Sequence, residues 1–97
     1  DGKSAQETLD TLTQADAGRE QRQAGIVDRD GNAATFTGSK CHDWAGGRTG
    51  PSYTVQGNIL TGPDVVDAME RAWLGTDATQ PLARRLLVAL VAGTLGM

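Results

Sequence analysis

Two short segments on either side of Asp30-Gly31 constrain the fold more than any other feature of the sequence. Residues 22–28 and 33–37 read as strands, the first alternating between two faces, and the Asp-Gly-Asn run between them accepts the positive φ angles of a tight hairpin turn. This pattern predicts two antiparallel strands. Residues 53–60 also alternate and predict a third strand.

Helical patterns lie on both sides of these strands. Residues 4–16 begin with Ser4 and Glu7 at the spacing of a capping box, residues 63–74 begin at a proline, and residues 81–92 carry a wide leucine stripe. The order of one helix, three strands and two helices predicts an α+β fold in which helices flank antiparallel strands. With 97 residues, the chain has room for one small domain at most.

The segment 39–52 is rich in glycine and predicts a loop between the second and third strands. Small side chains also mark the predicted hairpin, where Gly25, Ala33, Ala34 and Gly38 leave one face almost bare. A face of this kind suits close approach by a helix or by another sheet.

Charge and cysteine content exclude several classes of function. The net charge of −3 argues against a nucleic-acid or anionic-membrane partner, because either would require a basic face. One cysteine cannot form an internal disulfide, and one cysteine with one histidine cannot make a structural zinc site. No apolar run approaches the roughly 20 residues of a membrane span. We therefore expect no metal, no cofactor and a cytoplasmic location.

The neighbouring Cys41 and His42 resemble a nucleophile and its base. Adjacent residues of an extended chain point to opposite faces, however, which favours a structural Cys41 and a solvent-facing or hydrogen-bonded His42. The run from Gly46 to Gly50 around Arg48 could cradle an anion through its N–H groups or form a plain turn.

Asn58 follows Gln56-Gly57 on the third predicted strand. An asparagine held there can aim its side-chain N–H at a developing oxyanion, or it can simply bind backbone in the turn toward the next helix. Both interpretations remain open. Asp28 and Arg48 could bind substrate or be surface charges, and Trp44 and Tyr53 are more typical of core anchors.

With these residues in view, the chain resembles members of domain-of-unknown-function family 1028, a group with an N-terminal-nucleophile (Ntn) hydrolase-like fold. The resemblance extends through both flanking helical regions and covers nearly the whole chain. Its most specific parts are the segments QAGIVD (23–28), TGSKC (37–41), WAG (44–46) and VQGNIL (55–60), together with Gly31, Gly50 and Tyr53.

The resemblance implies a four-layer αββα sandwich in which helices cover both outer faces of two stacked antiparallel sheets. It also implies amide-bond hydrolysis by the first residue of a processed chain. On this basis Asn58 is the expected oxyanion contact, Gln56 a supporting pocket residue, and Arg48 a binder of substrate carboxylate.

Members of this family begin with an additional strand region, which would hold the nucleophile, and continue past the third helix. Asp1 is not a Thr, Ser or Cys, and Met97 leaves no room for a further strand. We therefore expect an incomplete domain, that is, a fragment or subunit completed by a missing N-terminal segment or a companion chain. The alternative is a non-catalytic scaffold that self-associates or pairs through exposed strand edges.

Overall fold

The computed structural model describes residues 2–95, so the expectations about Asp1 and Met97 lie outside the described residues. Helices occupy both ends of this range, and strands form its centre. In chain order the elements are α1 (Ala5–Gln14), the short 3-10 helix η1 (Arg19–Gln21), β1 (Gln23–Val27), β2 (Ala33–Thr37), β3 (Trp44–Gly50), β4 (Tyr53–Leu60), α2 (Asp64–Leu74) and α3 (Leu82–Leu95).

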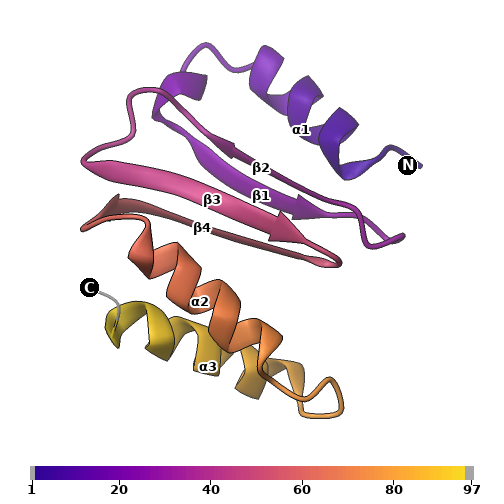
Figure 1. Ribbon diagram of the computed structural model, residues 1–97. Coiled ribbons are helices and arrows are strands. Elements are labelled where there is room, and N and C mark those ends of the chain that lie inside the picture. The colour runs from indigo at the N-terminus through magenta and orange to yellow at the C-terminus, as the bar shows by residue number, and fades with distance from the viewer. Residues whose placement is uncertain (1, 96–97) are drawn as a thin grey trace.

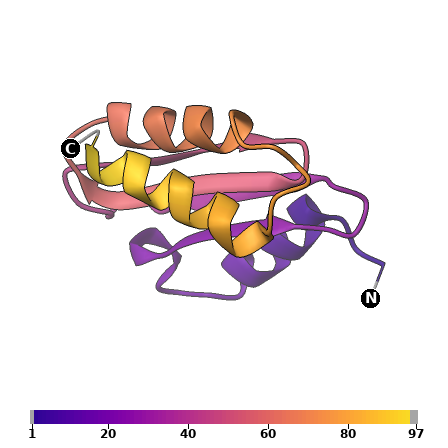
Figure 2. The same ribbon diagram turned by 90° about the horizontal axis from the view of Figure 1, so that it is seen from below.

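The strands form two antiparallel pairs, β1–β2 and β3–β4, which stack on each other (Figure 1). Strand β1 lies against β4, and β2 lies against β3. Helix α1 covers the outer face of the first pair, and α2 covers the outer face of the second. Helix α3 packs beside α2, as the view from below shows (Figure 2). The result is an α+β fold with antiparallel strands between helices.

The prediction of a loop over residues 39–52 is wrong in its second half, because β3 occupies Trp44–Gly50 and pairs with β4. The glycines of β3 hide its alternation from sequence reading. They are required by space: a Cβ on Gly50 would collide with the ring of Tyr53, and one on Gly46 would come within 2.8 Å of the Trp44 ring. Here glycine therefore indicates close packing within a strand rather than a flexible loop.

The small residues of the hairpin do not share one face, which corrects the sequence interpretation. Ala34 is buried against α1, whereas a Cβ on Gly25 would collide with Thr54 and Gln56 of the other sheet. Neighbouring residues of a strand point to opposite faces, so Ala33 and Ala34 could never have contributed to the same one. Only the Gly25 side makes the close contact between the sheets.

Helix α1 is fixed to the hairpin by polar contacts. Its N-cap is Ser4, which forms the capping box with Glu7. One carboxylate oxygen of Asp28 accepts the Ala5 N–H at 3.1 Å, and the other accepts those of Asp30 and Asn32 at 2.9 Å. Asp28 is therefore a structural residue that joins the hairpin turn to the start of α1.

Apolar clusters lie between each helix and its sheet, whereas the layer between the two sheets is polar and thin. Gln23 of β1 crosses this layer, and its Nε2 donates to the carbonyl oxygen of Gly57 at 2.8 Å and to Thr37 Oγ1 at 3.0 Å. The Thr35 hydroxyl donates to Gln56 Oε1 at 3.2 Å across the same layer. These side-chain bonds fix the relative position of the two sheets.

Candidate functional site

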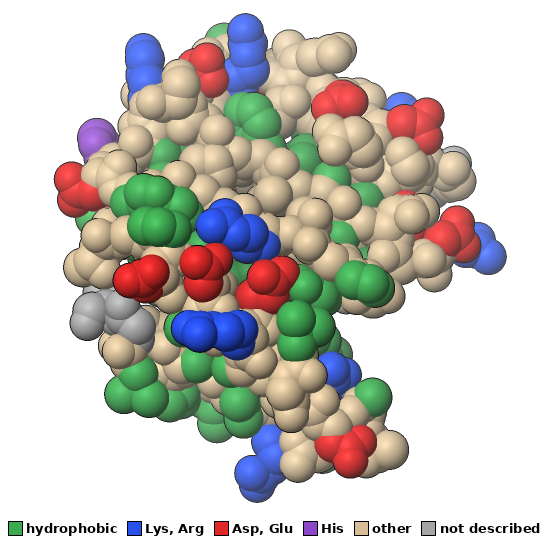
Figure 3. All heavy atoms as spheres, viewed as in Figure 1, with side chains coloured by type: hydrophobic (Ala, Val, Ile, Leu, Met, Phe, Trp, Pro, Cys, Tyr) green, Lys and Arg blue, Asp and Glu red, His purple; other side chains and the backbone are tan. Residues whose placement is uncertain are grey.

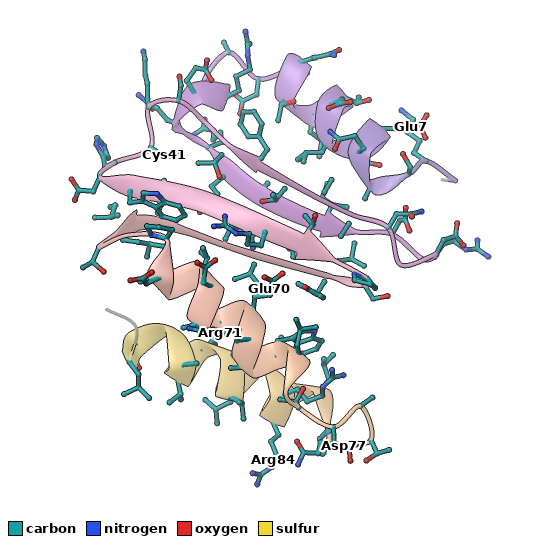
Figure 4. The ribbon with its side chains drawn as sticks, in the orientation of Figure 1. Glu7, Cys41, Glu70, Arg71, Asp77 and Arg84 are labelled. Atoms are coloured by element: carbon teal, nitrogen blue, oxygen red, sulfur yellow. The ribbon has the colours of Figure 1, made fainter. Side chains whose placement is uncertain are left out.

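A polar basin lies where the loop before β3 meets the end of β4. Its volume is about 560 Å³, and its walls come from η1, the loop and β4. Backbone bonds secure the loop, because the Lys40 N–H donates to the Glu20 carbonyl oxygen at 2.7 Å. Figure 4 labels Cys41 at this end of the sheets. The lining residues are Gln21, Lys40, Cys41, His42 and Asn58.

Asn58 is the most constrained side chain of the basin. Its Oδ1 accepts the backbone N–H groups of His42 and Ile59, each at 2.9 Å. Since both partners are donors, the amide oxygen faces them and the Nδ2 group faces elsewhere. Within residues 2–95, no acceptor binds this Nδ2. The two sequence interpretations of Asn58 are therefore compatible, because it binds backbone through its oxygen and retains two free N–H donors.

The backbone beside Asn58 is strained. Ile59 has a φ of 59°, a left-handed conformation that a β-branched residue rarely adopts. Strain of this kind costs about 1–3 kcal/mol and gathers at functional sites. Its effect here is to direct the end of β4 toward His42, whose carbonyl oxygen accepts the Ile59 N–H at 3.2 Å.

Cys41 and His42 line the basin without forming a catalytic pair. The Cys41 thiol donates to the Arg22 carbonyl oxygen at 3.6 Å, while the side chain of His42 is exposed. Over the described part of the chain, no hydrogen bond joins the two side chains. The contact of Cys41 with the backbone before β1 gives the thiol a structural partner and no base.

Gln56 and Arg48 lie away from Asn58 and away from each other. Gln56 belongs to the layer between the sheets, through its bond with Thr35. Arg48 lies on the opposite face of β3–β4, where its Nη2 is 3.2 Å from the Asp67 carboxylate of α2. The structure thus brings none of the three predicted site residues together. Neither the anion cradle nor the plain turn considered for Gly46 to Gly50 is present, because this run belongs to strand β3.

A second group of side chains fastens α2 to β4. The Tyr53 hydroxyl donates to the Glu70 carboxylate at 2.6 Å, and Figure 4 labels Glu70 on α2 beside the sheet. This hydrogen bond and the burial of the ring raise the pKa of Tyr53. Trp73 packs at a tilt against Tyr53, and the Arg85 guanidinium lies 3.9 Å from the centre of its ring. Tyr53 is accordingly a core anchor.

Sequence reasoning missed a groove of about 480 Å³ between the edge of β4 and the helices α2 and α3. The signal that could have revealed it is the wide leucine stripe of α3, which exceeds what a single neighbour can cover. Figure 3 shows hydrophobic side chains gathered over α3 at the lower edge of the molecule. The groove is lined by Val27, Ser52, Tyr53, Thr54, Val55, Gln56, Met69, Trp73, Leu82, Leu86, Ala89 and Leu90.

Within residues 2–95, no cluster of three or more His, Cys, Asp or Glu side chains could hold a metal ion. No helix in that range combines the length and the apolar character needed to cross a membrane.

Comparison with known proteins identifies the family. A model of the "Family of unknown function (DUF1028)" matches residues 1–95. The chain belongs to this family. The family predicted from the sequence is thereby confirmed. No curated protein matches the chain.

A crystal structure from the same family, of a protein of Silicibacter pomeroyi, is similar with a TM-score of 0.88 and 38% sequence identity. The similarity covers 96% of this chain and 42% of that one. The chain thus spans less than half the length of this DUF1028 relative.

Proposed function

We propose that this DUF1028 chain supplies an oxyanion-binding wall to an amide-bond hydrolase of the Ntn type, whose nucleophile comes from further polypeptide. The observation that carries the proposal is the anchored side chain of Asn58. Two backbone N–H groups hold its oxygen, and its Nδ2 group is left to donate beside the basin. The order of layers, with one helix and two helices outside two stacked sheets, agrees with an αββα hydrolase-like fold.

The anchoring suits the chemistry of amide cleavage. A tetrahedral intermediate places negative charge on the former carbonyl oxygen, and donors that are already oriented stabilise it without reorganisation. Removal of one such donor lowers kcat by about 10²–10³-fold in other hydrolases. The Cys41 thiol donates to a backbone carbonyl oxygen, and no base contacts it within the described residues. The proposal therefore takes its nucleophile from further polypeptide.

The test compares Asn58→Asp with the wild type in the intact protein that contains this chain. Aspartate keeps an oxygen that accepts the His42 and Ile59 N–H groups, so the fold should be retained, but it replaces the Nδ2 donors by a second oxygen and adds a negative charge that repels an oxyanion. Amine release from a panel of N-acyl amino-acid amides measures the activity. Gln80→Ala is the matched control, because this exposed amide lies in the loop between α2 and α3.

We expect Asn58→Asp to lower kcat by about 10²-fold or more with little change in KM, since the donor acts mainly in the transition state. Gln80→Ala should leave both constants unchanged. Turnover by Asn58→Asp at the wild-type rate would exclude the oxyanion role.

The second candidate function is a non-catalytic assembly module. It is favoured by the apolar face of α3, where Leu86 is 49% exposed and both Leu87 and Leu90 are about 60% exposed. Exposed apolar surface of this extent marks a site of protein contact. This candidate would be favoured over the hydrolase if the intact protein hydrolyses none of the amides and its Asn58→Asp variant still assembles normally.

A further inference from the structure

Helix α3 is apolar on nearly all sides but covered on only one. Its buried residues are Ala89 and Gly93, which face α2. The Gly93 position is so close that a Cβ there would lie 2.9 Å from the Met69 side chain. A helix that is hydrophobic all round is normally buried all round. The uncovered large side chains of α3 are Leu82, Leu86, Leu87, Val88, Leu90, Val91 and Leu95.

The strands beside this helix are also uncovered on one side. Strand β4 pairs only with β3, and β1 pairs only with β2, within the described residues. Since β1 lies against β4, their unpaired edges are on the same side of the molecule. Each sheet is only two strands wide, and the shortest extent of the Cα positions is 16 Å. Two stacked edges are therefore open next to the apolar face of α3.

The groove between them has two chemically distinct walls. The helical wall is apolar and includes Trp73, Leu86 and Leu90. The wall formed by the layer between the sheets carries the polar side chains of Thr54 and Gln56. A strand pairing with β4 would direct alternate side chains to these two walls.

We propose that this groove accepts an added β-strand from a further polypeptide, which pairs with the free edge of β4. Its large apolar side chains would contact Leu82, Leu86 and Leu90, and its small or hydroxyl side chains would enter the layer beside Thr54. Main-chain hydrogen bonds give affinity in this mode of recognition, and the alternating side chains give specificity. The inference deepens the assembly candidate above and does not depend on Asn58.

Two observations favour further polypeptide over a second copy of this chain. The DUF1028 relative from Silicibacter pomeroyi has more than half of its length outside the matched region, since the similarity covers 42% of it. In addition, the β4 edge of a second copy would bring Tyr53 and Val55, which are only 9% and 7% exposed beneath their own helices. The exposed large apolar side chain of β4 is Ile59, at 60%, which lies at the end of the strand and outside the groove lining. Such a strand therefore offers little apolar surface with which to fill the groove.

The experiment uses the part of the Silicibacter pomeroyi protein outside the matched region as the probe. It is co-expressed, untagged, with a tagged form of this chain, and captured material is quantified. Leu90→Glu places a charge in the groove, whereas Leu87→Glu places the same charge on α3 outside it. The two leucines are 59% and 60% exposed, so neither substitution should disturb folding.

We expect the wild-type chain and Leu87→Glu to capture the probe equally. Leu90→Glu should reduce capture by about tenfold or more, because an ionised carboxylate is costly to bury in an apolar groove. Hydrogen exchange at the backbone amides of β4 should slow by about tenfold or more in the complex, as expected for newly paired edge groups. Unchanged exchange in β4 would exclude strand addition.

Three further results would overturn the inference. If the wild-type chain captures no probe, the proposed occupant is wrong. If Leu87→Glu abolishes capture and Leu90→Glu does not, another face of α3 binds the probe. The assembly candidate is then retained, but the groove is excluded as the binding site. The wild-type chain could instead form a dimer that Leu90→Glu dissociates but that added probe does not dissociate. In that case the occupant of the groove is a second copy of the chain.

Discussion

The two outer layers of this molecule are built from helices of opposite design. Helix α1 has one narrow apolar stripe, and its inward residues Ala5 and Leu9 are 1% and 2% exposed. Helix α3 is apolar almost throughout, and only Ala89 and Gly93 are buried. The width of an apolar stripe corresponds to the number of neighbours that a helix requires. One sheet covers the apolar stripe of α1, whereas α2 alone leaves most of the apolar surface of α3 exposed.

The largest expected effect separates a covered leucine from an uncovered one. Leu9→Ala should lower the free energy of unfolding by about 2–5 kcal/mol, because it leaves a cavity between α1 and the first sheet. Leu87→Ala on α3, where the side chain is 60% exposed, should change it by less than about 0.5 kcal/mol. Urea denaturation at low protein concentration measures both. Equal losses at the two positions would mean that α3 is already covered.

Two glycine substitutions test how tightly the layer of α1, η1 and the β1–β2 pair is packed. A Cβ at buried Gly38 would collide with the backbone of Arg19 and Glu20, which cannot move without displacing η1. Gly38→Ala should therefore cost about 1–3 kcal/mol. At Gly62, nothing lies within 4 Å of the added Cβ, and Gly62→Ala should be neutral or stabilise by up to about 1 kcal/mol. The change in Tm measures both effects. A Gly38→Ala variant with the Tm of the wild type would contradict the close contact between Gly38 and η1.

Tyr53→Phe tests whether α2, unlike α3, is firmly attached to the β3–β4 pair. The bond from the Tyr53 hydroxyl to Glu70 fastens α2 to β4, and its loss should cost about 1 kcal/mol. The Glu70 carboxylate and burial raise the pKa of Tyr53 above its ordinary 10.0. A raised pKa means that the folded state favours the neutral phenol. This stabilisation is complete below pH 10 and is lost as the pH rises through the folded-state value.

Denaturation of the wild type and of Tyr53→Phe between neutral and alkaline pH measures this dependence. The difference in stability between the two proteins should shrink at alkaline pH. A constant difference across the range would show that the hydroxyl of Tyr53 does not bind Glu70 in solution.

The smallest effect concerns Asp28, which joins α1 to the hairpin. Partial burial raises the pKa of Asp28, but the N–H groups of Asn32, Ala5 and Asp30 outweigh it and bring the pKa below the ordinary 3.8. A lowered pKa stabilises the fold above the ordinary value, and the contribution disappears as the pH falls through the folded-state value. Asp28→Asn should therefore reduce stability at neutral pH and weaken its dependence on acid. Identical acid titrations of the two proteins would remove Asp28 from this role.

The sequence predicts those elements whose signals are local. The Ser4–Glu7 capping box marks the start of α1, and strands β2 and β4 have the bounds that the alternation predicts. Strand β3 could not be recognised, because its glycines show no alternation of apolar and polar side chains. Glycine is needed at position 50 because a Cβ there would collide with the ring of Tyr53. Local turn chemistry likewise singled out Asn58, although not the direction in which its amide points.

Features that depend on stacking escaped the sequence. The crossing of Gln23 from β1 to the Gly57 carbonyl oxygen exists only once the two sheets lie together. Arg48 and Gln56 are separated because they lie on opposite faces of the β3–β4 pair, in which Arg48 pairs with Val55 and Gly47 pairs with Gln56. The groove beside α3 requires the relative positions of three elements.

The central claim is that the α3 side of the molecule is a protein-binding surface and the α1 side is not. Leu12 on α1 and Leu90 on α3 are equally exposed, at 59%, so the two leucines form a matched pair. Light scattering of the chain mixed with the Silicibacter pomeroyi probe, over a concentration series, measures its mass against the 10.1 kDa of a single copy. We expect the wild type and Leu12→Glu to form a heavier complex with the probe, and Leu90→Glu to keep the single-copy mass. A wild-type chain that stays at 10.1 kDa in the presence of the probe, or equal loss of the complex with both variants, would contradict the claim.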